Sequence, residues 1–180
     1  MTPVFSNKNI SLATLEDIPV IMDLLNSAYR GERSKQGWTT EAHLIAGESR
    51  IDEKMLSDVL QMKGSVLLKY QTGENKIVGC VNLQQHGEKI YLGMFSVSPE
   101  LQGAGIGKQL LQAAEAYTRS IGCRAIYMSV VSVRTELINW YMRHGYDDTG
   151  ERKPFPEDPV TGKHLQQLEF MIMEKKLAES

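Results

Sequence analysis

Cysteine is scarce in this 180-residue chain, and both cysteines, Cys80 and Cys123, lie in apolar stretches. Two cysteines cannot build a disulfide scaffold, and their wide separation argues against a metal or redox pair. We therefore expect two reduced, buried thiols. The four histidines are scattered without the spacing of zinc ligands, so we expect no metal site.

Long apolar runs and an excess of positive charge are also missing. No run of 18 apolar residues is present, so we expect no membrane span. The N-terminal residues lack the apolar core of a secretory signal. Twenty Lys and Arg against 22 Asp and Glu give a net charge of −2, whereas nucleic-acid-binding domains usually carry a basic excess. These absences predict a cytoplasmic protein with neither a membrane nor a nucleic acid as its partner.

The composition that remains is typical of a globular protein. Hydrophobic residues make up 42% of the chain and charged residues 23%. There is no internal repeat, low-complexity tract or flexible linker, so we expect one domain over residues 1–180. A chain of this size buries enough surface to need no disulfide or metal for its core.

The first third of the chain indicates one strand and two helices. Residues 10–13 read as a short strand. Thr14 and Asp17 form a capping pattern ahead of a helix. Asp52 is placed to cap a second helix, and the segment between, residues 38–50, is ambiguous. The apolar stripe of the first helix is formed by Ile18, Ile21, Leu24, Leu25 and Ala28.

The remaining elements indicate a mixed α/β sheet. Residues 65–70, 76–84 and 89–97 read as an antiparallel meander, with a tight turn centred on His86 and Gly87. A helix then runs to about Ser120 and is capped by Gly122. Strands are expected at 125–131, 146–152 and 168–176, with a helix at 134–144 that is capped by Gly145.

We place Leu137, Ile138, Tyr141 and Met142 on one side of that helix. The strand-helix-strand order from 89 to 131 allows a parallel pair joined by a right-handed crossover, with helices on the faces of the sheet.

The most informative motif is the glycine cluster Gln102-Gly-Ala-Gly-Ile-Gly-Lys108, which follows a strand and opens a helix. Such a turn exposes backbone N–H groups at the positive end of the helix dipole, and glycine allows an anion to approach closely. Glycines at a helix start cost roughly 1 kcal/mol each, which favours a functional reason for them. A phosphate or pyrophosphate is the ligand that this chemistry suits.

Two common phosphate-binding fingerprints do not fit. A Gly-x-Gly-x-x-Gly frame started at Gly103 ends on Lys108, and one started at Gly105 ends on Leu110. A Walker loop needs Ser or Thr after Gly107-Lys108, where this chain has Gln109. Both failures disfavour a nucleotide-binding domain.

The pattern Gln-x-x-Gly-x-Gly, formed by Gln102, Gly105 and Gly107, resembles the pyrophosphate loop of the GNAT superfamily of acyl-CoA-dependent N-acyltransferases. The preceding segment 94–102 resembles that family's fourth strand. Residues 140–146 resemble its tyrosine, here Tyr141, four residues before a Gly-aromatic pair. The resemblance covers about residues 10–176. It implies a mixed sheet of six to seven strands with helices on both faces, and acetyl-CoA as co-substrate without a metal.

The resemblance also implies roles for individual residues. In the family the fourth and fifth strands splay, and the thioester arm lies in the gap. The backbone of Phe95, Ser96 and Val97 would then bind the acyl and pantetheine groups, as N–H donors near a developing oxyanion. The N–H groups of the loop would hold the pyrophosphate, and the loop residues concerned are Gln102, Gly103, Ala104, Gly105, Ile106, Gly107 and Lys108.

Tyr141 is the candidate general acid, because the pKa of a phenol is close to that of the departing thiol. It also lies on the apolar stripe of its helix, and a core role is compatible with catalysis. Seven residues earlier the family often has an Asn that binds the cofactor arm. Here that position is Arg134, for which contact with a phosphate, with the substrate or with Glu136 stays open.

The acceptor and the general base are less defined. An amine must be neutral to attack, so a base or a water chain is needed. Glu41, Glu136 and His86 are candidates for the base. Trp38 and Glu41 are placed to cap the acceptor, although Thr39 or Thr40 is equally well placed to begin a helix against which Trp38 packs.

We therefore expect an N-acetyltransferase that acts on a primary amine, either a small molecule or a protein, and leave a homodimer open. The alternative is a non-catalytic acyl-CoA-binding sensor or interaction module.

Overall fold

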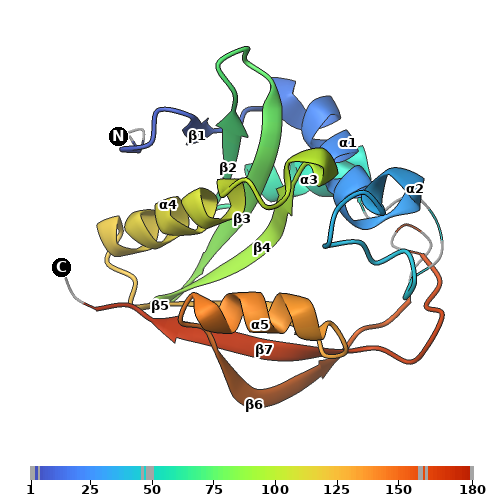
Figure 1. Ribbon diagram of the computed structural model, residues 1–180. Coiled ribbons are helices and arrows are strands. Elements are labelled where there is room, and N and C mark those ends of the chain that lie inside the picture. The colour runs from blue at the N-terminus through green and yellow to red at the C-terminus, as the bar shows by residue number, and fades with distance from the viewer. Residues whose placement is uncertain are drawn as a thin grey trace.

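The computed structural model describes residues 3, 5–45, 47, 51–157, 160 and 162–178, and these residues form one seven-stranded sheet with helices on both faces (Figure 1). The sheet order is β1-β2-β3-β4-β5-β7-β6. Its strands are β1 (Ile10–Leu12), β2 (Ser65–Gln71), β3 (Ile77–His86), β4 (Lys89–Val97), β5 (Ala125–Val131), β6 (Asp147–Pro154) and β7 (Glu169–Lys176). The predicted mixed sheet is confirmed.

Four longer helices cover the sheet. α1 (Ile18–Tyr29) and α3 (Glu53–Gln61) lie on one face, and α4 (Ile106–Ser120) and α5 (Thr135–Arg143) lie on the other (Figure 1). Each face has its own buried cluster, and the central strand β3 contributes to both. The described chain also holds short helical segments at η1 (Leu15–Asp17), α2 (Gly31–Ser34) and η2 (Pro99–Leu101). The predicted helical stripe of α1 is buried as expected.

The predicted helix caps are confirmed. The Asp17 carboxylate accepts a hydrogen bond from the Thr14 N–H at 2.9 Å, and Asp52 Oδ1 accepts one from the Met55 N–H at 2.8 Å. Gly122 and Gly145 follow α4 and α5 with φ angles of 78° and 94°, a region that favours glycine.

Two details of the sequence-based assignment are wrong. The β3–β4 hairpin pairs His86 with Lys89, so its central residues are Gly87 and Glu88, one position later than predicted. Met142 is 51% exposed rather than buried with Tyr141. Successive helix residues differ by about 100° around the axis, so Met142 turns away from the sheet that Tyr141 faces.

The site is positioned by the separation of β4 from β5. The two strands are parallel, as predicted, but their register covers only Lys89–Tyr91 against Ala125–Tyr127. Beyond this point the strands diverge, as Figure 1 shows. On the other side of β4, the register with β3 shifts between Cys80 and Asn82. Met94 there has a positive φ of 49°, which marks a local distortion of the strand.

Both cysteines are buried and neither forms a disulfide, which confirms the prediction of two buried thiols. The Cys80 thiol donates to the Met94 carbonyl oxygen at 3.3 Å. Among the described helices, none combines the length and apolar character that a membrane crossing requires.

Candidate active site

Two cavities open at the separation of β4 and β5. The larger, about 300 Å³, is lined by residues of the glycine loop and of α5. The smaller, about 140 Å³, lies toward β5 and the segment that carries Glu41. We call them the loop cavity and the inner cavity. Four residues line both, namely Tyr29, Phe95, Leu137 and Tyr141.

The glycine loop presents unpaired backbone donors to the loop cavity. Gly103 and Gly105 have φ angles of 93° and 85°, which L side chains rarely adopt. α4 begins at Ile106, and its first regular bond runs from the Gln109 N–H to the Gly105 oxygen at 3.1 Å. The backbone N–H groups of residues 106–108 donate no hydrogen bond to any described residue. The loop therefore combines free N–H groups with the positive end of a helix dipole.

One predicted loop donor is already used. The Ala104 N–H donates to the Leu101 carbonyl oxygen at 3.2 Å, which closes the turn that precedes α4. The expectation that Ala104 contributes its N–H to a ligand therefore does not fit this geometry. The side chains of Ala104 and Ile106 do not line either cavity, so Ile106 is limited to its backbone N–H.

The Gln102 side chain joins the loop to the segment 37–41. Its Oε1 accepts from the backbone N–H groups of Trp38 at 2.7 Å and Thr39 at 3.2 Å. Its Nε2 donates to Thr39 Oγ1 at 2.7 Å and to the Val97 carbonyl oxygen at 3.0 Å. The approach is tight, because a Cβ on Gly37 would lie 2.2 Å from Gln102 Oε1. Sequence reasoning considered only the backbone of Gln102.

An ion pair reinforces this connection. Arg33 Nε lies 2.7 Å from Glu100 Oε1, and Arg33 Nη2 lies 3.3 Å from Oε2. The Ser98 hydroxyl also donates to Glu100 at 2.6 Å. Hydrogen bonds from Arg33 and Ser98 lower the pKa of Glu100 to about 2.

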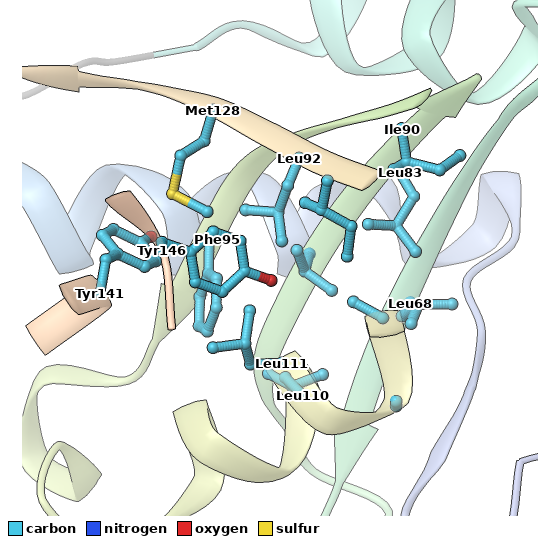
Figure 2. Packing of buried hydrophobic residues seen from close by; sticks show 14 of the residues in the cluster. Leu68, Leu83, Ile90, Leu92, Phe95, Leu110, Leu111, Met128, Tyr141 and Tyr146 are labelled. Carbon is cyan, nitrogen blue, oxygen red and sulfur yellow. The ribbon is translucent and has the colours of Figure 1, made fainter. Parts of the chain in front are cut away.

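Tyr141 lies between the two cavities. It is 6% exposed and contacts Trp140, Phe95 and Tyr146, with ring centroids 5.2, 6.3 and 5.9 Å away. Figure 2 shows Tyr141, Tyr146 and Phe95 at one end of the cluster that Leu110 and Leu111 of α4 complete. The tyrosine predicted as general acid is thus fixed by packing and lines both cavities.

Tyr29 was missed by sequence reasoning. It is the last residue of α1 and is buried, and its hydroxyl donates to the Phe95 carbonyl oxygen. It therefore holds the distorted part of β4 against α1. Tyr29 lies four residues after Leu25 and continues the predicted apolar stripe, so this spacing could have indicated that its side chain faces the sheet.

A buried charge cluster closes the inner cavity. Glu41 Oε2 lies 3.0 Å from Arg30 Nε, and Glu41 Oε1 lies 3.5 Å from Arg134 Nη1. Arg134 also donates through Nη2 to the Thr39 carbonyl oxygen at 2.6 Å. Arg134 lines the inner cavity and is not among the residues that line the loop cavity. Glu136 was one of the partners left open for Arg134, but the described protein contacts of the Arg134 guanidinium are with Glu41 and Thr39.

Trp38 and Glu41 were predicted to cap one acceptor, but they line different cavities. Trp38 lines the loop cavity, where its ring lies 6.3 Å from Trp140. Trp140 also packs on His144, with centroids 4.1 Å apart. Neither Trp140 nor His144 was predicted as a lining residue, although their spacing of four places them on one face of α5. Val97, Gly103 and Lys108 line the loop cavity as well.

Other predicted residues lie away from these cavities. Ser96 is 2% exposed and lines neither cavity. Glu136 is exposed at the start of α5 and also lines neither. His86 lies beside Lys89 and Tyr127 at the paired end of β4 and β5. Of the three base candidates, Glu41 alone lines a described cavity of the site.

The predicted alternative of a helix after Thr39 or Thr40 is wrong for the described residues of that segment. Residues 41–45 form a single turn closed by the Ile45 N–H to Glu41 oxygen bond at 2.9 Å. Thr40 Oγ1 accepts from the Ala42 N–H at 3.1 Å, so its capping chemistry serves this turn. Ile45 then pairs with His164 as an isolated β-bridge, which ends the turn.

Comparison with known proteins agrees with this geometry. The family model described as Acetyltransferase (GNAT) family matches residues 20–146. An amino-acid acetyltransferase of Ralstonia nicotianae is 28% identical over 172 residues, which is 91% of this chain and 31% of that protein. The chain thus spans about a third of that relative.

Solved structures with the same fold include the ribosomal-protein-S18-alanine N-acetyltransferase of Escherichia coli. It has a TM-score of 0.69 and 16% identity, over 95% of this chain and 94% of that one. The ribosomal-protein-alanine N-acetyltransferase of Brucella melitensis has a TM-score of 0.68 and 18% identity, over 93% and 99%. These structural likenesses concern the fold.

The chain belongs to the GNAT acetyltransferase family. This family uses acetyl-CoA as co-substrate and acts on amine acceptors.

Proposed function

We propose that this protein transfers the acetyl group of acetyl-CoA directly to a primary amine, with Tyr141 as general acid. The observation that carries the proposal is the position of Tyr141, which is buried and lines both the loop cavity and the inner cavity. A thioester carbonyl between the two cavities would meet an amine from the inner cavity.

In this proposal the loop cavity takes the coenzyme. The N–H groups of residues 106–108, at the start of α4, would bind the pyrophosphate, with Gly103 and Gly105 allowing close approach. Lys108 lines the same cavity and would add positive charge. The pantetheine arm would follow the β4 edge at Phe95 and Val97, in the gap left by β5.

The reaction forms one bond and breaks one. The amine nitrogen attacks the thioester carbonyl carbon, and the carbon–sulfur bond then breaks. The thiolate takes a proton from the Tyr141 hydroxyl, and the phenolate is reprotonated from solvent. Packing fixes the ring of Tyr141, and a positioned hydroxyl is what general acid catalysis requires.

In this proposal the acceptor ammonium loses one proton to water before the neutral amine attacks, and the nitrogen of the adduct then loses a second proton to water. Glu41 is poorly suited to accept either proton, because its two oxygens already face Arg30 and Arg134. Both ion pairs are buried, and removing one partner of a buried pair is costly. We therefore assign Glu41 to holding the two arginines in place.

The names of similar proteins offer two acceptor classes. The Ralstonia protein is named for amino acids, and the two solved neighbours are named for alanine of ribosomal proteins. We therefore propose a small primary amine or a protein N-terminal amine as the acceptor. The inner cavity that would receive it has a volume of about 140 Å³.

The proposal is tested by release of free CoA thiol, followed with Ellman's reagent over a panel of amines and peptides. Acetyl-CoA should also raise the melting temperature increasingly as its concentration rises, because it binds the native state. ATP and NAD serve as controls and should produce no comparable shift. Stabilisation by acetyl-CoA without thiol release from any acceptor would instead favour a coenzyme-binding sensor.

A further inference from the structure

Arg134 is a buried cation with few protein partners. It is 8% exposed, and among the described residues its guanidinium donates one hydrogen bond, to the Thr39 oxygen at 2.6 Å. Its ion pair with Glu41 is longer, at 3.5 Å. A guanidinium carries five N–H donors, so this one bond leaves donors of Arg134 for a ligand. Since Arg134 lines the inner cavity, these contacts indicate a site that a ligand completes.

The electrostatics around Arg134 favour an anion. Glu41 is shared between two guanidinium groups, and Arg30 holds the shorter contact at 3.0 Å. α5 begins directly after Arg134, so the positive end of its dipole adds to the potential there. The guanidinium carbon also lies 5.9 Å from the centre of the Tyr29 ring, which limits its movement.

Arg134 is correctly placed relative to Tyr141 to bind one end of an acceptor. The two residues are seven positions apart, or about two turns of α5, and therefore share one helix face. Both line the inner cavity, and Tyr141 also reaches the loop cavity. An acceptor with its amine near Tyr141 would thus present its other end to Arg134.

Apolar side chains also line part of the inner cavity. Phe155 and Phe170 lie in it with their rings stacked, 4.3 Å between centroids. Leu92, Met128 and Val131 line it as well. A volume of about 140 Å³ suits a small molecule with an apolar group.

We propose that the acceptor is an amine that also carries a carboxylate, an amino acid with a small apolar side chain, and that Arg134 binds the carboxylate. This inference rests on the proposed function. It separates the two acceptor classes, because a polypeptide N-terminus carries a neutral amide where a free amino acid carries its carboxylate. A guanidinium would bind the carboxylate through charge-assisted, bidentate hydrogen bonds.

The first experiment compares matched acceptors. Each apolar amino acid is paired with its carboxamide, which has the same amine and side chain without the charge, and with a peptide that begins with the same residue. kcat/KM should be about 10- to 100-fold higher for the acid than for the amide or the peptide. Equal rates for acid and amide would overturn the inference and leave the proposed function intact. Thiol release from none of the acceptors would overturn the proposed function, and the inference with it.

The second experiment uses Arg134→Gln, which removes the charge but retains hydrogen-bonding groups. KM for the acid should rise by about 10- to 100-fold, KM for the amide should rise much less, and KM for acetyl-CoA should stay within twofold. Arg134→Lys, which keeps the charge without the fork, should lie between. Arg143→Gln, on the exposed last turn of the same helix, is the control. A matching loss for acid and amide would overturn the carboxylate role.

A binding measurement covers the case in which Arg134→Gln is destabilised. The N-acetyl derivative of a preferred amino acid should raise the melting temperature of the unmodified protein more than its N-acetyl amide does. That difference should disappear in Arg134→Gln and become smaller in Arg134→Lys, as measured in whichever of the two variants retains the shift produced by acetyl-CoA. Equal shifts from both ligands in the unmodified protein would contradict the inference.

Discussion

Gln102 Oε1 accepts the backbone N–H of Trp38 at 2.7 Å, across 64 positions of sequence. This bond joins the glycine loop to the segment that carries Glu41, and three further bonds of the same side chain brace it. A ligand that orders the loop should therefore also order the wall of the inner cavity.

Gln102→Ala should impair the acceptor more than the coenzyme, because the loop N–H groups remain while the segment 37–41 loses its attachment. We expect KM for the acceptor to rise about tenfold, and the melting temperature to fall by a few degrees, since a hydrogen bond contributes about 1 kcal/mol. Steady-state kinetics and thermal denaturation measure both effects. Gln112→Ala, exposed on α4, should change neither.

Gly105→Glu should abolish coenzyme binding, because it places a negative carboxylate beside the N–H groups of α4. The substitution also strains a backbone with φ of 85°. Gly150→Glu is a matched control, since Gly150 has φ of 87° and lies on the exposed strand β6. The acetyl-CoA thermal shift should be lost in the first variant and kept in the second. A folded Gly105→Glu protein that binds acetyl-CoA normally would show that the loop does not hold the pyrophosphate.

Tyr141→Phe removes the proposed proton source and keeps the ring and its packing. We expect kcat to fall by about 10²–10⁴-fold, the usual contribution of a positioned general acid. Acetyl-CoA affinity should barely change, because the hydroxyl acts mainly in the transition state. Tyr127→Phe, at the paired end of β4 and β5, is the control. Turnover of Tyr141→Phe within threefold of the unmodified protein would mean that another group donates the proton.

The Glu100–Arg33 ion pair should stabilise the protein in a defined pH range. The folded-state pKa of Glu100 is about 2, below its ordinary value of 4.5. Its contribution is therefore fully present above about pH 4.5 and is lost as the pH falls through about 2. Both side chains are more than 40% exposed, so solvent screens the pair and we expect only about 0.2–1 kcal/mol.

This expectation is checked by chemical denaturation of Glu100→Gln and the unmodified protein across that range. The difference in unfolding free energy should be largest near neutral pH and should shrink toward pH 2. Added salt should reduce it, because exposed charges are screened. A difference that is constant with pH would show that the variant acts through the lost hydrogen bond of Ser98 rather than through charge.

The sequence alone determined the elements whose signals are local. The stripe of α1, the caps at Asp17, Asp52, Gly122 and Gly145, and the glycine loop before α4 each depend on residues a few positions apart. Helix periodicity and capping act over that range, so a single sequence is enough to predict these elements. The place of Tyr141 on α5 followed from the same local pattern.

Tertiary structure decided which side chains share a cavity. No pattern of neighbouring residues indicated that Trp38 and Glu41 line different cavities. Both cavities lie where β4 diverges from β5, which only the folded sheet determines. The sequence left the contact of Arg134 open between a phosphate, the substrate and Glu136, whereas in the structure Arg134 donates to Thr39, 95 positions away, and lines the inner cavity. Contacts over such separations depend on how the sheet and its helices pack, and no spacing in the chain encodes them.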